Sequence, residues 1–245
     1  MKNWTFILLF FLFAIACGKD DDSATSIDWG YDYYPAEVGY WLEYEVDSIF
    51  YDDFTDPVTI DTANYCMREE FESVFQDLSG EDNFRIEQYK KNDTANAWIL
   101  DKIVSSKVTT TNFQKVENDL RFIPLVFPVK TDKSWDGLIY LNVQNEPTLE
   151  YYDDTQYPWG YRYTEVNVSK QLGNFSFDSC VVVAHIDDEN LFEKKYSQEI
   201  YAKGVGLVYK EMIVLKTQAP PNGQPFLDRA ESGFIIKQTI KNYPQ

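Results

Sequence analysis

The sequence predicts a mainly β protein whose strands form a single antiparallel curved sheet, either a half-barrel or a barrel. Apolar and polar residues alternate over many short segments, which is the pattern of strands with one wet face. Turn-forming residues separate these segments at short intervals. Aromatic residues make up 17% of the chain, and strands favour aromatic and β-branched residues. About ten strands with close turns are typical of such a sheet.

The first half of the folded part begins with the clearest strand. Over residues 41–51, Leu42, Tyr44 and Val46 share one face and acidic residues share the other. Four further strands are predicted over residues 64–75, 84–91, 97–104 and 107–116. Asn118 and Asp119 then predict a hairpin turn into residues 120–129. Two prolines in that last run predict a sheet edge or irregular structure.

The second half continues with a turn around Trp135 and a long loop over residues 140–158 that contains one short strand. Strands are predicted over residues 161–170, 175–186, 191–203, 207–217 and 234–240. Gly204-Val205-Gly206 predicts a tight hairpin, because glycine adopts the positive φ that such turns need. Phe192, Tyr196 and Ile200 are four residues apart and also fit a helix face, but the charged residues after Phe192 and the hairpin favour a strand.

The N-terminus has the layout of a secretory signal peptide. Lys2 is followed by an apolar run over residues 6–15 and by Ala16, a small residue at the expected cleavage site. Ten apolar residues are fewer than the roughly 20 that cross a bilayer, so a transmembrane anchor is the weaker interpretation.

Ala14-Ile15-Ala16-Cys17 resembles the lipobox of bacterial lipoproteins. The resemblance implies cleavage before Cys17 and acylation of that cysteine, and two or three acyl chains hold a protein stably on a membrane. The alternative is an ordinary signal peptide with an incidental cysteine. The expected organisation is a signal peptide over residues 1–16, a lipidated Cys17 with a flexible acidic tether over 17–32, and one β-rich domain over 33–245.

The residues after Cys17 resemble the export signal of surface lipoproteins of the Bacteroidota, which has a lysine followed by acids. Here these are Lys19, Asp20, Asp21 and Asp22. The resemblance implies an outer-membrane protein at the cell surface, with the membrane and the lipoprotein export machinery as partners. The alternative is a solvated acidic tether.

Three later segments, residues 125–129, 133–137 and 201–211, look like segments of Bacteroidota lipoproteins, a resemblance that implies no particular activity. The hairpin at Gly204 is also similar to one in half-barrel periplasmic proteins of the lipid-carrier type.

The charge excludes some partners. The net charge is −18, and removal of the leader, whose one charged residue is Lys2, leaves −19. Such a field repels nucleic acid.

No catalytic constellation stands out. His185 is the only histidine, which excludes multi-histidine metal sites. It is predicted at a strand end beside Asp187, where a plain histidine is the favoured interpretation over a catalytic one. No Gly-x-Ser-x-Gly elbow, P-loop or dinucleotide fingerprint is present. We therefore expect no catalytic residue, no metal and no cofactor.

Other candidate residues have two interpretations each. Cys66 and Cys180 could form a disulfide or remain two buried thiols. Ser23, Thr62 and Thr94 stand in three-residue segments that resemble the O-glycosylation acceptor of exported Bacteroidota proteins.

Aromatic residues cluster over residues 29–41 and again over 151–163. Such rings could stack on sugars, but packing in the core is the favoured interpretation.

Two functional hypotheses follow. The first is a non-enzymatic lipoprotein that binds a hydrophobic ligand, a glycan or an envelope partner. The second is a hydrolase of glycans that uses two carboxylates facing each other across a cleft. The lack of a catalytic motif favours the first.

Overall fold

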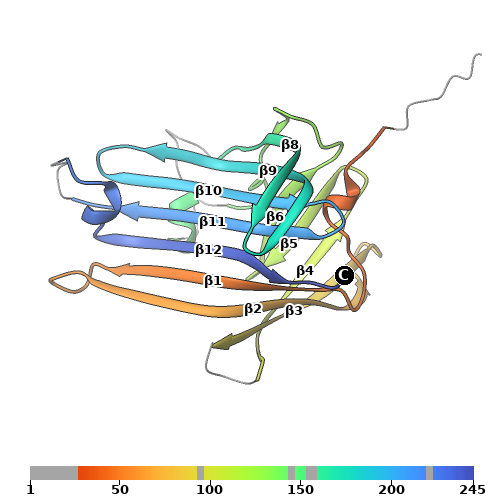
Figure 1. Ribbon diagram of the computed structural model, residues 1–245, viewed down its shortest axis with the longest axis horizontal. Coiled ribbons are helices and arrows are strands. Elements are labelled where there is room, and N and C mark those ends of the chain that lie inside the picture. The colour runs from red at the N-terminus through yellow and green to blue at the C-terminus, as the bar shows by residue number, and fades with distance from the viewer. Residues whose placement is uncertain (1–26, 93–96, 143–146, 153–158, 219–222) are drawn as a thin grey trace, which may run out of the picture.

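The computed structural model describes residues 27–92, 97–142, 147–152, 159–218 and 223–245. The predicted signal peptide, Cys17, the export signal 19–22, Ser23 and Thr94 lie outside the described residues. Within these ranges the chain forms one 12-stranded sheet in which every pair of neighbouring strands is antiparallel, in the order β6-β5-β4-β3-β2-β1-β12-β11-β10-β9-β8-β7. Figure 1 shows the sheet curling so that β4, β5 and β6 pass behind the later strands.

The first half of the sheet is made of β1 (Trp41–Asp52), β2 (Thr59–Gln76), β3 (Asp82–Asn92), β4 (Ile99–Val108), β5 (Asn112–Glu117) and β6 (Leu120–Val126). The second half is made of β7 (Ser134–Trp135), β8 (Tyr161–Leu172), β9 (Phe175–Glu189), β10 (Glu193–Ala202), β11 (Gly206–Lys216) and β12 (Ser232–Asn242). Besides the strands, the described residues form short 3₁₀ helices: η1 (Tyr31–Tyr33) before β1, η3 (Pro147–Tyr152) between β7 and β8, and η4 (Phe226–Arg229) between β11 and β12.

The sheet is nearly closed into a barrel because its two edges meet. The indole N–H of Trp135 on β7 donates to the carbonyl of Ile123 on β6 at 2.7 Å, and the Ile123 N–H donates to the Gly137 carbonyl at 2.9 Å. The Tyr163 hydroxyl donates to the carbonyl of Val126 at 2.8 Å and accepts from its N–H at 2.9 Å. These contacts satisfy backbone groups that an open edge would leave exposed.

This architecture confirms the predicted fold class. Phe192, Tyr196 and Ile200 do not form a helix, because residues 193–202 are β10 and pair with β9 and β11. Pro124 lies in β6, which is the edge strand that its missing N–H predicts. Gly204 and Gly206 both have positive φ in the β10–β11 hairpin.

Two predicted elements differ from the structure. The strand expected over residues 107–116 is broken by a hairpin turn, because the hydroxyl of Thr109 accepts hydrogen bonds from the N–H groups of Thr111 and Asn112. The loop 140–158 was expected to contain one short strand, whereas its described residues 140–142 and 147–152 contain the 3₁₀ helix η3 and no strand. A third difference is that the turn around Trp135 contains the two-residue strand β7.

The segment just before the predicted domain start contacts the sheet. Asp28, in the predicted tether, forms an ion pair with Lys203 of the β10–β11 hairpin. The following Tyr33 and Tyr34 are buried, and the Tyr34 ring stacks on Phe113 with ring centroids 3.6 Å apart. Residues 28–32 therefore lie against the folded domain.

Two apolar clusters hold the sheet in shape. The larger lies inside the barrel and includes Phe71, Ile86, Val104, Leu125 and Tyr163. The smaller includes Cys180, Val182, Ile200 and Val208, against which Phe175 of the β8–β9 hairpin packs. Within the described residues no helix has the length and apolar character needed to cross a bilayer.

Candidate functional site

The barrel interior holds a cavity of about 280 Å³, slightly below the usual range for small-molecule sites. Residues from both halves of the sheet line it, among them Glu69 of β2, Lys115 of β5 and Glu199 of β10. The lining includes the exposed residue Asn118 in the β5–β6 turn, so the cavity reaches the surface beside that hairpin.

The polar lining consists of polar residues on the strand face that otherwise carries apolar side chains toward the barrel interior. On β2, Glu69 falls between Met67 and Phe71, and on β12, Gln238 falls between Ile236 and Ile240. Side chains two residues apart point to the same face of a strand. Each polar residue therefore points into the barrel, because the apolar residues two positions before and after it on the strand do so.

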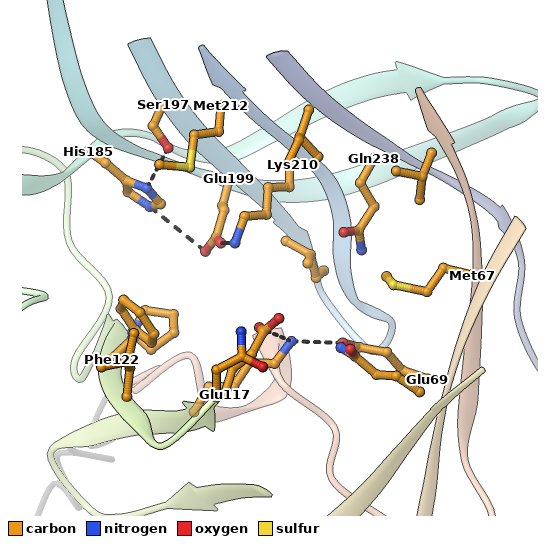
Figure 2. A pocket seen from close by; sticks show the side chains of 18 of the residues that line it. Met67, Glu69, Glu117, Phe122, His185, Ser197, Glu199, Lys210, Met212 and Gln238 are labelled. Atoms are coloured by element: carbon orange, nitrogen blue, oxygen red, sulfur yellow. Dashed lines mark hydrogen bonds and ion pairs between the residues drawn. The ribbon is translucent and has the colours of Figure 1, made fainter. Parts of the chain in front are cut away.

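The charged side chains that line the cavity form ion pairs, and Figure 2 shows Lys210 beside Glu199. The Lys210 ammonium lies 3.0 Å from a Glu199 carboxylate oxygen. Lys115 lies 2.7 Å from Glu69 and 3.9 Å from Glu117, and Glu117 also pairs with Lys102. Each lysine thus has a carboxylate partner.

These contacts fix the charge states. Burial favours the neutral forms of Glu117 and Glu199, but nearby lysines outweigh it and lower the pKa of each carboxyl to about 2. Burial likewise opposes the charge of Lys115 and Lys210, yet the glutamates raise the pKa of both ammonium groups. All four groups are ionised at neutral pH.

His185 is placed differently from its prediction. It lies inside β9 and lines the cavity with 4% of its surface exposed, because the strand continues to Glu189. Burial lowers its pKa to about 4, so the imidazole is neutral. Its Nδ1 lies 3.0 Å from the Ser197 hydroxyl, and its Nε2 lies 3.8 Å from Glu199. The ring stacks on Tyr161 with centroids 3.9 Å apart.

One wall of the cavity is aromatic. Phe122, Tyr151, Tyr152, Trp159 and Tyr161 line it, and the Tyr152 and Trp159 rings meet edge to face with centroids 4.8 Å apart. Four of these belong to the predicted aromatic cluster over residues 151–163. The rings are largely buried, as core packing predicts, yet they also face the cavity. Tyr157 of that cluster lies outside the described residues.

The two cysteines do not pair. Cys66 on β2 and Cys180 on β9 are both buried and no disulfide joins them in the structure, which departs from the disulfide interpretation. Four strands separate β2 from β9 in the sheet. Cys66 instead lies 3.0 Å from the Lys241 ammonium.

Thr62, the one candidate glycosylation residue that the structure describes, is exposed on β2. Among the described residues, no group of three or more His, Cys, Asp or Glu side chains could hold a metal ion.

Several residues of the cavity were not predicted from the sequence: Glu69, Gln88, Glu117, Glu199, Lys210 and Gln238. The sequence contains a signal for several of them, because each stands between apolar residues two positions before and after it, on the same face of a strand. It is weak in any single strand, because the same pattern arises when a residue faces solvent.

The fold and the cavity define a class: an antiparallel, nearly closed β-barrel domain with a charged interior. A solved structure from Bacteroides fragilis, of a protein thought to be exported and with a YmcC-like fold, is similar to this chain. It is 10% identical over 86% of this chain and 98% of that chain, with a TM-score of 0.42. A Parabacteroides distasonis protein thought to be a lipoprotein is 9% identical over the same shares, with a TM-score of 0.34. No protein-family model and no curated protein matches the sequence.

Proposed function

We propose that the protein is an envelope-anchored lipoprotein of the outer membrane that binds a small molecule in the barrel cavity and performs no chemistry on it. The lipobox at Cys17 supports the anchor, and the cavity of about 280 Å³ supports the binding role. A cavity that is lined by hydrogen-bonding groups and aromatic rings, and that reaches the surface, is what a small-ligand site requires.

The lining favours a polar ligand over a long acyl chain. Four lysines, three glutamates and one aspartate line the cavity, and an acyl chain would strip water from them without offering hydrogen bonds. This argues against a lipid-carrier role, which the β10–β11 hairpin resemblance suggested.

The second candidate is a hydrolase of glycans, because Glu69, Glu117 and Glu199 all line the cavity. Such an enzyme needs one carboxyl with a raised pKa to act as the general acid. The pKa of both Glu117 and Glu199 is instead lowered to about 2 by lysines. The binding role therefore fits better.

Ser197, His185 and Glu199 are also close together, in the composition of an acyl-transfer triad. The distance of 3.8 Å from His185 Nε2 to Glu199 is too long for a hydrogen bond. With a pKa of about 4, His185 is also a weak base at neutral pH.

The binding role is tested by blocking the cavity. Met212 lines it, whereas the next residue, Ile213, points to the other face of β11. We expect Met212→Phe to narrow the cavity and Ile213→Phe to leave it open. Saturation-transfer NMR is carried out with the small-molecule fraction of an envelope extract. Some molecules should receive saturation from the wild type and from Ile213→Phe but not from Met212→Phe; identical spectra for all three would contradict the proposal.

A further inference from the structure

Three uncharged polar groups line the cavity without a hydrogen-bond partner among the described residues. They are Oε1 of Gln88, Nε2 of His185 and Nε2 of Gln238. These side chains are 2%, 4% and 7% exposed. A buried polar group without a partner costs free energy, so three of them around one cavity indicate that a ligand completes their hydrogen bonds.

The donor or acceptor role of two groups follows from their other contacts. The Gln88 amide N–H donates to Oε1 of Glu69 at 2.6 Å, and the Lys115 ammonium donates to the same oxygen. This orients the Gln88 amide so that its oxygen faces the cavity as an acceptor.

His185 offers a donor. Its Nδ1 lies 3.0 Å from the Ser197 hydroxyl, and its Nε2 faces the ionised Glu199 at 3.8 Å. A carboxylate on that side favours the tautomer with the ring proton on Nε2, in which Nδ1 accepts from Ser197. Gln238 offers its amide N–H, and Figure 2 shows both side chains projecting into the cavity. The ligand must therefore accept from two donors and donate to one acceptor.

The charged groups leave no charge for a ligand to neutralise. The four lysines of the lining all have carboxylate partners: Lys210 pairs with Glu199, Lys115 with Glu69, Lys102 with Glu117 and Lys90 with Asp101. The net charge of the whole chain is −18, which further disfavours an anion. A cation would have to compete with lysines that the glutamates already hold.

A hydroxyl both donates and accepts, so one chemical group suits all three orphaned positions. The aromatic wall around Tyr152 and Trp159 adds an apolar surface against which a flat ring face packs. Several hydroxyls in a fixed arrangement around a ring with apolar C–H faces describe a sugar.

We propose that the cavity binds one ring of an uncharged sugar, whose hydroxyls bond Gln88, His185 and Gln238 while a face of the ring lies on the aromatic wall. This inference rests on the proposed binding function and narrows its ligand class.

The test uses the full chain and a panel of probes in three chemical classes. Neutral sugars are represented by the methyl glycosides of glucose, galactose and mannose and by N-acetylglucosamine. Charged sugars are represented by glucuronate and glucosamine, and apolar ligands by laurate. Binding is measured by saturation-transfer NMR and by titration, with Met212→Phe as the blocked-cavity variant.

We expect a neutral sugar to bind the wild type and to lose about tenfold in affinity in Gln238→Leu, since one hydrogen bond is worth up to about 1.5 kcal/mol. Thr239→Val, at the next position on the opposite face of β12, is the matched control and should bind as the wild type does. Gln238→Leu removes a buried orphan amide, so its melting temperature should not fall. If it does not fold, His185→Phe, which keeps the ring stacked on Tyr161, provides the same test.

Three outcomes would overturn the inference. In one, only a charged sugar or laurate binds, and Met212→Phe abolishes that binding; the cavity would then be a ligand site of another class and the proposed function would stand. In another, a neutral sugar binds equally well to wild type and Gln238→Leu. In the third, no probe binds; the envelope-extract experiment then shows separately whether the binding function also fails.

Discussion

The ion pair between Lys210 and Glu199 offers the sharpest test of the cavity's electrostatics. The change is Lys210→Met, which keeps most of the side-chain volume and removes the charge. Glu199 has a side chain that is 7% exposed, so it would become a buried carboxylate whose main partner is gone. His185 and Tyr201 would remain beside it.

The magnitude follows from the geometry. At 3.0 Å and an effective dielectric constant of about 20, two unit charges attract by about 5.5 kcal/mol. The Lys210 side chain is 35% exposed, so solvent screens the pair and the lost contact is worth less than that figure. We expect the free energy of unfolding at about pH 7 to fall by about 3 kcal/mol, the lower end of the cost of breaking a buried pair.

The pH dependence gives the prediction its sign. In the wild type Glu199 has a pKa of about 2; without Lys210 burial raises that pKa, and the carboxyl becomes protonated more easily. Lowering the pH from about 7 to about 4.5 therefore relieves the penalty in Lys210→Met and narrows its gap to the wild type. Urea unfolding at both pH values measures this gap.

Two controls complete the experiment. The double variant Glu199→Gln, Lys210→Met removes both charges and should lie within about 1 kcal/mol of the wild type. Lys237→Met removes an exposed lysine from the neighbouring strand and should cost less than about 0.5 kcal/mol. A loss in Lys210→Met that is small, or that is unchanged by pH, would refute the reasoning.

Three further predictions concern other parts of the molecule. His185 has a pKa of about 4 in the fold and about 6.5 when unfolded, so the free energy of unfolding should fall by up to about 3 kcal/mol as the pH drops between these values. The lowered pKa of Glu117 should extend this loss below about pH 4.5. Urea midpoints across this range measure the loss, and a flat profile would contradict the prediction. Gly233→Ala should lower stability by more than about 2 kcal/mol, because φ is +111° and an added Cβ would lie 2.0 Å from the Val214 carbonyl oxygen. Thermal unfolding measures this loss. Gly223→Ala is the milder control, because a Cβ added there would have no atom within 4 Å. Cys17→Ser should abolish incorporation of labelled palmitate and release the protein from the membrane fraction, and an unchanged fraction would rule out the lipid anchor.

Local patterns were sufficient to predict most strands, and particular cases show why. The alternation over residues 41–51 predicted β1 almost to the residue, because side-chain direction in a strand depends only on the pleat. The glycines at 204 and 206 predicted the hairpin in the same local way. The failure at Thr109 is also local, since three consecutive threonines are as suitable for a hydroxyl-bonded turn as for a strand.

Part of the cavity was accessible from the sequence. Once the hairpin at Gly204 is known, its register places Glu199 directly opposite Lys210, so this cross-strand ion pair could have been predicted. Its burial could not, because residues on the two faces of a hairpin look alike until the curvature of the sheet is known.

The rest of the site required the tertiary structure. Lys115 meets Glu69 although β5 and β2 are not neighbours in the sheet, and His185 lies near Glu199 at a register shift between β9 and β10 that the sequence does not reveal. The sequence by itself predicted an exported-type leader and a set of antiparallel strands, both of which depend on nearby residues, and it determined the net charge of −18. The closure of the sheet decided which faces became interior, because curvature is a property of all twelve strands together and brings charges from distant strands into one cavity.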